Sequence, residues 1–162
     1  MSEIIESLQT EYAGKLLLTM LISMVPVVEL RGGIPFGAAM GLDPLSAAAA
    51  AVVGNLLPVP LVMLFIRHIF AWLKRFEGLR IFVEKMEKKI HLKGRKVMKY
   101  QKLGLCILVA IPLPGTGAWT GAMVAAFMDM RFKRAIPPIV LGVIIAALIV
   151  TCITYGLLAA LF

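Results

Sequence analysis

The sequence predicts an all-α integral membrane protein built as an inverted repeat, in which each half is a re-entrant helical hairpin followed by a transmembrane helix. Three observations predict this class. The 162 residues are 60% hydrophobic and have a mean hydropathy of +0.93, which is too apolar for a soluble domain. Two apolar stretches are interrupted near their centres, and each precedes a longer uninterrupted one. Most basic residues lie in one segment between the halves, which predicts an amphipathic basic connector helix.

The first interrupted stretch predicts a re-entrant hairpin at residues 14–42. Uncharged runs at 16–28 and 32–42 flank the segment ELRGGIP at 29–35, which we place at the bend. A helix rises ~1.5 Å per residue, so each arm spans roughly 16–20 Å, about half of a ~30 Å hydrocarbon core. One arm therefore reaches the middle of a bilayer without crossing it. Residues 1–11 have apolar side chains at helical spacing and predict a short amphipathic surface helix.

The second half repeats this design. An uncharged run at 103–128 is broken near its centre by the segment PLPGTG at 112–117, which predicts a second hairpin at 103–130. Two interrupted hydrophobic segments at matching places in two halves point to a transport site. All 162 residues thus form one membrane domain, with a first repeat at 1–66 and a second at 103–162.

Each hairpin is followed by an uncharged run that is long enough to cross a bilayer once. These runs predict transmembrane helices at 44–66 and 136–161. Asp43 suits the N-cap of the first helix, and Pro44 suits its first position because a proline there loses no helical hydrogen bond.

The charge distribution predicts the topology. The connector at 67–102 carries a net charge of +9, whereas the rest of the chain carries −1. Basic loops stay in the cytoplasm, so the connector is expected on that side of the cell (inner) membrane. If the second hairpin re-enters, the basic segment 131–134 also lies in the cytoplasm, and both termini of this multi-pass chain lie on the outer side. The alternative is four full spans, which would place the two basic segments on opposite sides.

The basic connector has two open interpretations. Its apolar residues recur every three or four positions, which is typical of an interfacial helix with snorkelling lysines. The same spacing is compatible with a short coiled-coil contact between subunits. Nucleic acid is not an expected partner, because one juxtamembrane segment carries the whole charge excess and its natural partners are anionic membrane lipids.

The two bends carry the candidate binding residues. In each hairpin the second arm begins at the bend, so its free N–H groups and helix dipole point to the middle of the bilayer and attract anions. Arg31 can hold a phosphate or carboxylate through two hydrogen bonds. Glu29, influenced by both burial and Arg31, can exchange a proton in each transport cycle. The structural alternative is an ion pair that fixes the bend.

The other candidates are residues that permit close backbone approach or offer polar atoms: Gly32, Gly33, Pro35, Asn55, Pro112, Pro114, Gly115, Thr116, Gly117, Trp119 and Thr120. Thr116 is expected to cap the second arm. Trp119 either closes a cavity or packs against its neighbours. The prolines Pro58 and Pro60 predict a kink in the first transmembrane helix, and Asn55 either satisfies the backbone that they free or joins the site.

The sequence does not predict an enzyme. It contains no Ser-His-Asp, Cys-His or metal-ligand spacing, so we expect no catalytic residues, no cofactor and no metal site. Cys106 and Cys152 stand alone in apolar segments and are expected to behave as small apolar residues.

The two bends resemble those of the small multidrug export protein family, through ELRGGIP at 29–35, PLPGTG at 112–117 and WTGA at 119–122. This resemblance implies export across a membrane. More distantly, the chain resembles the DedA superfamily, which implies paired re-entrant hairpins and proton-coupled translocation of lipids such as undecaprenyl phosphate. DedA proteins carry arginines beside the second bend, where this chain has Ala110 and Thr116.

These observations predict a small ion-coupled transporter or flippase for an anionic lipid or amphiphile of the polyprenyl-phosphate type. The coupling ion is H⁺ or Na⁺, and a homodimer is expected because two full spans enclose little space. One alternative is proton-coupled efflux of lipophilic cationic drugs, with Arg31 tied away beneath Glu29 instead of facing a cavity. Another is a membrane scaffold that binds anionic lipid and has a filled, dry centre.

Overall fold

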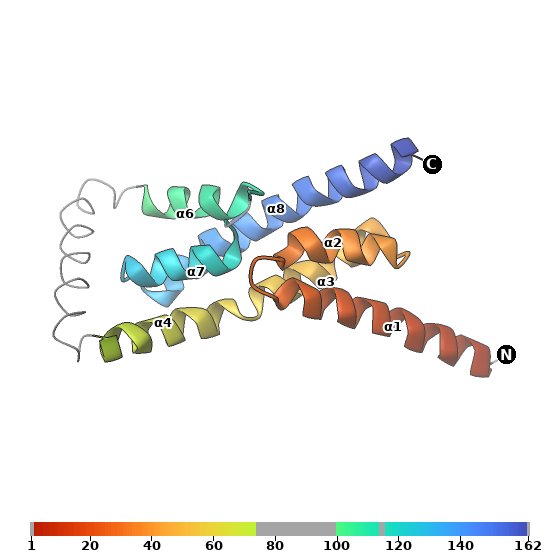
Figure 1. The fold of residues 1–162 in the computed structure, drawn as a ribbon, viewed down its shortest axis with the longest axis horizontal. Coiled ribbons are helices and arrows are strands. Elements are labelled where there is room, and N and C mark those ends of the chain that lie inside the picture. Colours follow the sequence, from red (N-terminus) through yellow and green to blue (C-terminus); the bar gives the residue numbers. More distant parts are fainter. Residues whose placement is uncertain (1, 74–99, 114–115, 162) are drawn as a thin grey trace.

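The computed structural model describes residues 2–73, 100–113 and 116–161, and all regular structure in these ranges is helical (Figure 1). The helices are α1 (Ser2–Met24), α2 (Glu29–Ala39), α3 (Pro44–Leu56), α4 (Val59–Leu73), α6 (Gln101–Ala110), α7 (Ala118–Phe127) and α8 (Phe132–Leu161). The predicted all-α class is confirmed. Most of the predicted connector helix, residues 74–99, lies outside the described residues.

Helices α1 and α2 form a hairpin, and both arms pack on α3. Small residues bring the arms together: a Cβ on Gly33 would overlap the Ser23 hydroxyl, and one on Gly37 would lie 3.0 Å from Thr19 Oγ1. Thr19 and Ser23 are fully buried. Their hydroxyls donate to the carbonyls of Lys15 (2.8 Å) and Thr19 (2.7 Å), so the close contact leaves neither hydroxyl unpaired. This is the small-residue packing that membrane helices use.

The first bend lies earlier than predicted. Helix α1 ends at Met24, so the bend comprises residues 25–28, and the segment 29–35 is the first part of α2. Pro26 explains the position, because a residue without an N–H cannot continue the hydrogen-bond ladder of α1. The two adjacent glycines, which we had expected to form the turn, are packing positions within a helix.

Two helices also begin earlier than predicted. Helix α1 runs unbroken from Ser2, so residues 1–11 do not form a separate surface helix. Helix α8 begins at Phe132, and its two prolines, Pro137 and Pro138, lie inside it. A proline near the start of a helix leaves few carbonyls unpaired, and those carbonyls are close to the polar end of α8.

The first apolar span begins with the predicted cap. Asp43 Oδ2 accepts a hydrogen bond from the Ser46 N–H at 3.0 Å, and Pro44 is the first helical residue. Within the ranges that the structure describes, two segments are long and apolar enough to cross a membrane, Pro44–Ile66 with a mean hydropathy of 2.2 and Phe132–Ala160 with 2.7. Both present large apolar side chains at the surface of the chain, as lipid-facing helices do.

Helices α6 and α7 form a second hairpin that packs on α8. Glycines again mark the close contacts: a Cβ on Gly142 of α8 would lie 2.7 Å from Val109 Cβ and 2.8 Å from the Cys106 carbonyl oxygen. Gly121 of α7 contacts the same valine side chain. Val109 is buried between the three helices and is part of the single apolar core.

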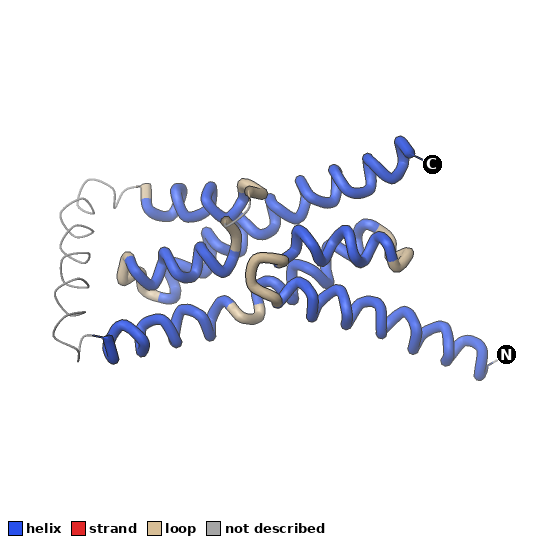
Figure 2. The backbone as a smooth tube through the Cα atoms, in the orientation of Figure 1, coloured by secondary structure: helices blue, strands red, loops and turns tan. Residues whose placement is uncertain are grey.

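The two hairpins point toward each other and meet at the centre of the molecule. Figure 1 shows the far ends of α1 and α8 at one end, and the end of α4 and start of α6 at the other. Each second arm packs on the span of the opposite half, α2 on α8 and α7 on α4. In Figure 2 the bend between α1 and α2, the break between α3 and α4, and the bend between α6 and α7 lie at one level along the long axis.

Candidate functional site

Glu29 is the first residue of α2, and its carboxylate lies at the beginning of α7 in the other hairpin. The side chain is only 3% exposed, and Oε1 accepts a hydrogen bond from the Trp119 N–H at 3.2 Å. The N–H groups at the start of a helix have no partner in their own helix and carry partial positive charge. The Glu29 carboxylate therefore supplies an anion to an N-terminus that no side-chain cap of its own satisfies.

Gly117 makes room for this carboxylate. It is the N-cap of α7 and has a φ of +142°, a conformation that is open almost only to glycine. A Cβ at this position would lie 2.6 Å from Glu29 Oε1 and would overlap Oε2. Glu29 itself has a φ of +50°, which is unusual for a residue with a side chain. Only a glycine thus fits at 117, and Glu29 accepts an unfavourable backbone conformation at the point where its carboxylate meets α7.

Arg31 contacts the second bend at its α6 end, whereas Glu29 contacts the start of α7. Its Nη2 donates to the Ile111 carbonyl (3.2 Å) and to Thr116 Oγ1 (3.0 Å), and its Nη1 donates to the Leu113 carbonyl. Ile111 directly follows α6, so its carbonyl belongs to the negative end of that helix. The guanidinium nitrogen Nε is buried and has no hydrogen-bond partner.

Thr116 organises the second bend but does not cap α7 as predicted. Its hydroxyl interacts with the carbonyls of Ile111 (2.7 Å) and Leu113 (2.9 Å) on the α6 side of the bend. The acceptor for the α7 N-terminus comes from Glu29 instead. Thr116 thus helps to hold Arg31 in place, because its hydroxyl contacts the same two carbonyls that the guanidinium contacts.

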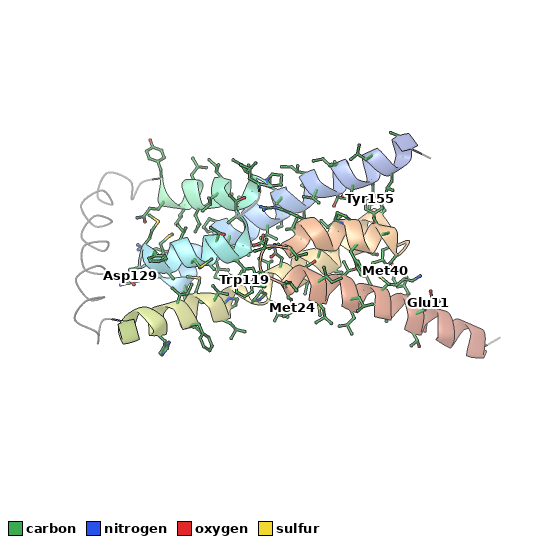
Figure 3. All side chains as sticks on the ribbon, viewed as in Figure 1. Glu11, Met24, Met40, Trp119, Asp129 and Tyr155 are labelled. Carbon is green, nitrogen blue, oxygen red and sulfur yellow. The ribbon has the colours of Figure 1, made fainter. Side chains whose placement is uncertain are left out.

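Trp119 completes the contact between the hairpins. Its indole Nε1 donates to the carbonyl of Met24, the last residue of α1, at 3.2 Å. Figure 3 shows these two residues together at the centre of the molecule, with Asp129 and Tyr155 toward opposite ends. We call the contacts made by Glu29, Arg31 and Trp119 the hairpin clasp.

The clasp connects each charge to a helix end of opposite polarity. Among the described residues, Glu29 and Arg31 do not form an ion pair with each other, so the structural alternative of an ion pair within the first bend is wrong. The acid satisfies the positive end of α7, and the base satisfies the negative end of α6.

The other predicted site residues divide into two groups. Pro112 lies in the second bend and Thr120 in the first turn of α7, whereas Pro114 and Gly115 lie outside the described residues. Within α2 lie the three that were expected at the first bend: Gly32, Gly33 and Pro35. Gly32 and Gly33 are close-packing positions beside Val28 and Ser23, and Pro35 is exposed, so none of the three supplies a polar group to the second hairpin.

Asn55 lies near the end of α3, where the predicted kink is confirmed as an interruption of the helix. The prediction that its side chain satisfies the freed backbone is wrong. The residue is fully buried, and both Oδ1 and Nδ2 lack a hydrogen-bond partner.

The sequence did not identify the backbone partners of the clasp, because carbonyls and N–H groups occur at every residue. It also missed a polar cluster at the turn before α3, where the Tyr12 hydroxyl contacts Asp43 Oδ1 (2.9 Å) and Ser46 Oγ (2.7 Å). Nearby, the Tyr155 hydroxyl donates to the Leu42 carbonyl at 2.7 Å. Tyr155, a polar group within the otherwise apolar α8, was the available signal. No group of three His, Cys, Asp or Glu suited to a metal ion occurs in the described part of the chain.

A buried acid, a half-buried base and two helix ends come together where the two hairpins meet, and ionisable groups inside apolar helices are typical of membrane transport proteins. The family model described as "Putative small multi-drug export protein" matches residues 29–149. The match covers most of the chain, which therefore belongs to this family. The family indicates a membrane protein with a transport role. Neither the curated proteins nor the solved structures compared with the chain gave a match.

Proposed function

We propose that this chain is an ion-coupled transporter or flippase that moves an anionic amphiphile of the polyprenyl-phosphate class across the cell membrane. The observation that carries the proposal is the Glu29 carboxylate at the N-terminus of α7. A helix N-terminus that binds a carboxylate of the chain itself can bind the anionic group of a cargo instead. Arg31, two residues after the same acid in α2, would then supply the second contact.

In this mechanism Glu29 acts as a replaceable anion. Protonation removes its charge and weakens its hold on the α7 N–H groups, so that a phosphate can take its place. Deprotonation returns the carboxylate and displaces the cargo. The steric constraint at Gly117 makes the two states exclusive, because the space beside its Cα admits one acceptor at a time.

The proposed topology places both hairpins inside the membrane. They re-enter from opposite faces and meet at mid-depth, which agrees with the opposed hairpins and with the break levels in Figure 2. The basic residues at 131–134 then lie on the cytoplasmic side with the connector, and both termini lie outside. Two copies form the transporter, because the two long apolar spans of one chain enclose little volume.

The test is transport of a labelled polyprenyl phosphate by full-length protein in liposomes, with and without a pH gradient. Wild type moves the lipid, and the gradient accelerates it. Glu29→Gln keeps a hydrogen-bond acceptor but cannot change its charge, so we expect it to lose the response to the gradient. Arg31→Ala lowers the rate by at least about tenfold, or about 1.4 kcal/mol. Lys15→Ala is the matched control, because its charge pairs with Glu11 (2.9 Å) outside the clasp.

Wild-type rates in both clasp variants would refute the site, and no lipid movement by wild type would refute the cargo. An alternative cargo, lipophilic cationic drugs, has one observation in its favour beyond the family description. Arg31 already donates hydrogen bonds to the carbonyls of the second bend, so Glu29 would be the charge available to a cation. Uptake of tetraphenylphosphonium by the same liposomes, lost in Glu29→Gln but retained in Arg31→Ala, would establish the cation alternative. If wild type moves neither compound, the scaffold interpretation replaces both.

A further inference from the structure

The break between α3 and α4 leaves backbone carbonyls without donors. Pro58 and Pro60 have no N–H, so the carbonyls of Gly54 and Leu56 lose the donors that would lie four residues further along the helix. The one N–H within the break donates to the carbonyl four residues before it, at 3.1 Å, and so satisfies neither of these two. The end of α3 therefore presents oxygen atoms and the partial negative charge of a helix C-terminus.

Asn55 adds a second, independent observation at the same turn. Its side chain is fully buried, yet neither its amide oxygen nor its amide nitrogen has a partner. Buried amides almost always have hydrogen bonds, because leaving the group unsatisfied is costly. The neighbouring Gly54 lies against α1 so closely that a Cβ would overlap the Met20 carbonyl, so α1 covers this side of the turn.

The chemistry of this turn selects a class of ligand. Its available groups are uncharged oxygen atoms, the backbone carbonyls and Asn55 Oδ1, and no carboxylate belongs to α3 or α4 within the described residues. Divalent cations need carboxylate ligands, whereas neutral oxygens at the end of an interrupted helix suit a monovalent cation. The break also lies at the same level as both hairpin bends (Figure 2).

We propose that the end of α3 is a Na⁺ site formed by Asn55 Oδ1 and the carbonyls of Gly54 and Leu56. As a coupling-ion site this rests on the proposed function, but binding of Na⁺ can be measured without any cargo. Occupation of the site satisfies the amide oxygen and the two free carbonyls together, and it fixes the angle between α3 and α4. Because α7 packs on α4, this angle sets the position of the second hairpin.

The test measures thermal unfolding of the full-length protein in detergent, in NaCl and in choline chloride of equal ionic strength, together with binding of ²²Na⁺. Wild type is expected to bind Na⁺ saturably, with a melting temperature higher by roughly 3 °C at about ten times the dissociation constant. Asn55→Leu has a similar volume and removes the amide. It is expected to melt at or above the wild-type temperature in choline and to show no response to Na⁺.

Two further variants make the result specific. Asn55→Asp places a carboxylate at the site and is expected to tighten Na⁺ binding by about tenfold or more. Thr151→Val is the matched control: Thr151 Oγ1 is another buried atom without a partner, but it lies one turn from Tyr155 near the outer end of α8. This variant keeps the Na⁺ response of wild type.

A Na⁺ response that survives Asn55→Leu, or a wild type that melts identically in both salts and binds no ²²Na⁺, would overturn the site. The liposome assay tests the cargo separately from the cation site. If Na⁺ binds but polyprenyl phosphate does not move, the proposed cargo is wrong and the cation site stands.

Discussion

Replacing Gly117 with alanine tests the hairpin clasp directly. The φ of +142° is costly for any residue with a Cβ, by about 1–3 kcal/mol. The added Cβ would also overlap the Glu29 carboxylate and expel it from α7, which removes a charged hydrogen bond worth about 1.5–3 kcal/mol. We therefore expect Gly117→Ala to lower the free energy of unfolding by roughly 3–6 kcal/mol.

A double-mutant cycle separates the two contributions. In a Glu29→Ala background there is no carboxylate to expel, so Gly117→Ala should cost only its backbone share, and the coupling between the sites should be about 1.5–3 kcal/mol. The assay is reversible unfolding in mixed micelles, followed by circular dichroism. Gly41→Ala is the matched control: Gly41 also has a positive φ, +80°, but no atom lies within 4 Å of its added Cβ, so we expect a loss of about 1–2 kcal/mol. Additive losses at Glu29 and Gly117 would refute the contact.

Three further predictions use the same unfolding assay. Trp119→Phe replaces the indole with a smaller aromatic ring that lacks the N–H donating to Met24, and should cost at least about 1 kcal/mol, whereas an unchanged stability would show that the indole bond contributes nothing. Gly33→Ala should cost about 1–3 kcal/mol because its Cβ overlaps Ser23 Oγ, while Gly104→Ala, with open space around it, should be neutral or stabilising. The Ser46 hydroxyl and N–H, followed by the Tyr12 hydroxyl, lower the pKa of Asp43 from 3.8 to about 2. Because this pKa is lower in the folded state, the contribution of Asp43 is complete above about pH 4 and is lost as the pH falls through 2. An Asp43→Asn variant should therefore show a flatter loss of stability below pH 4, and equal slopes would contradict the prediction.

The sequence was sufficient for the all-helical class and for two of the interruptions. The prolines at 58 and 60 and the PLPGTG segment predicted breaks that the structure contains, because a residue without an N–H stops the hydrogen-bond ladder of a helix. The first bend was misplaced because two adjacent glycines suggested a turn. In the folded chain Gly33 instead allows α2 to lie against Ser23, a distinction that depends on the neighbouring helix and not on the local sequence.

The candidate site was predictable in its residues but not in its contacts. Glu29 and Arg31 stand out because charges are costly in apolar segments. Both were predicted as binding residues, with an ion pair between them as the structural alternative, whereas in the structure each charge binds a helix end in the other hairpin. Those partners are backbone groups about 80 to 90 residues away, and no side-chain pattern identifies them.

The crossed contacts of the clasp also concern how the protein is made. Glu29 and Arg31 leave the ribosome about eighty residues before the helix ends that satisfy them. Until α6 and α7 are synthesised, the first half carries two charges whose partners do not yet exist, so its hairpin is a poor candidate for stable insertion by itself. Biogenesis of this small chain is therefore expected to be nearly all-or-none, with the nascent first half waiting at the membrane surface or in the insertion machinery until the second half arrives.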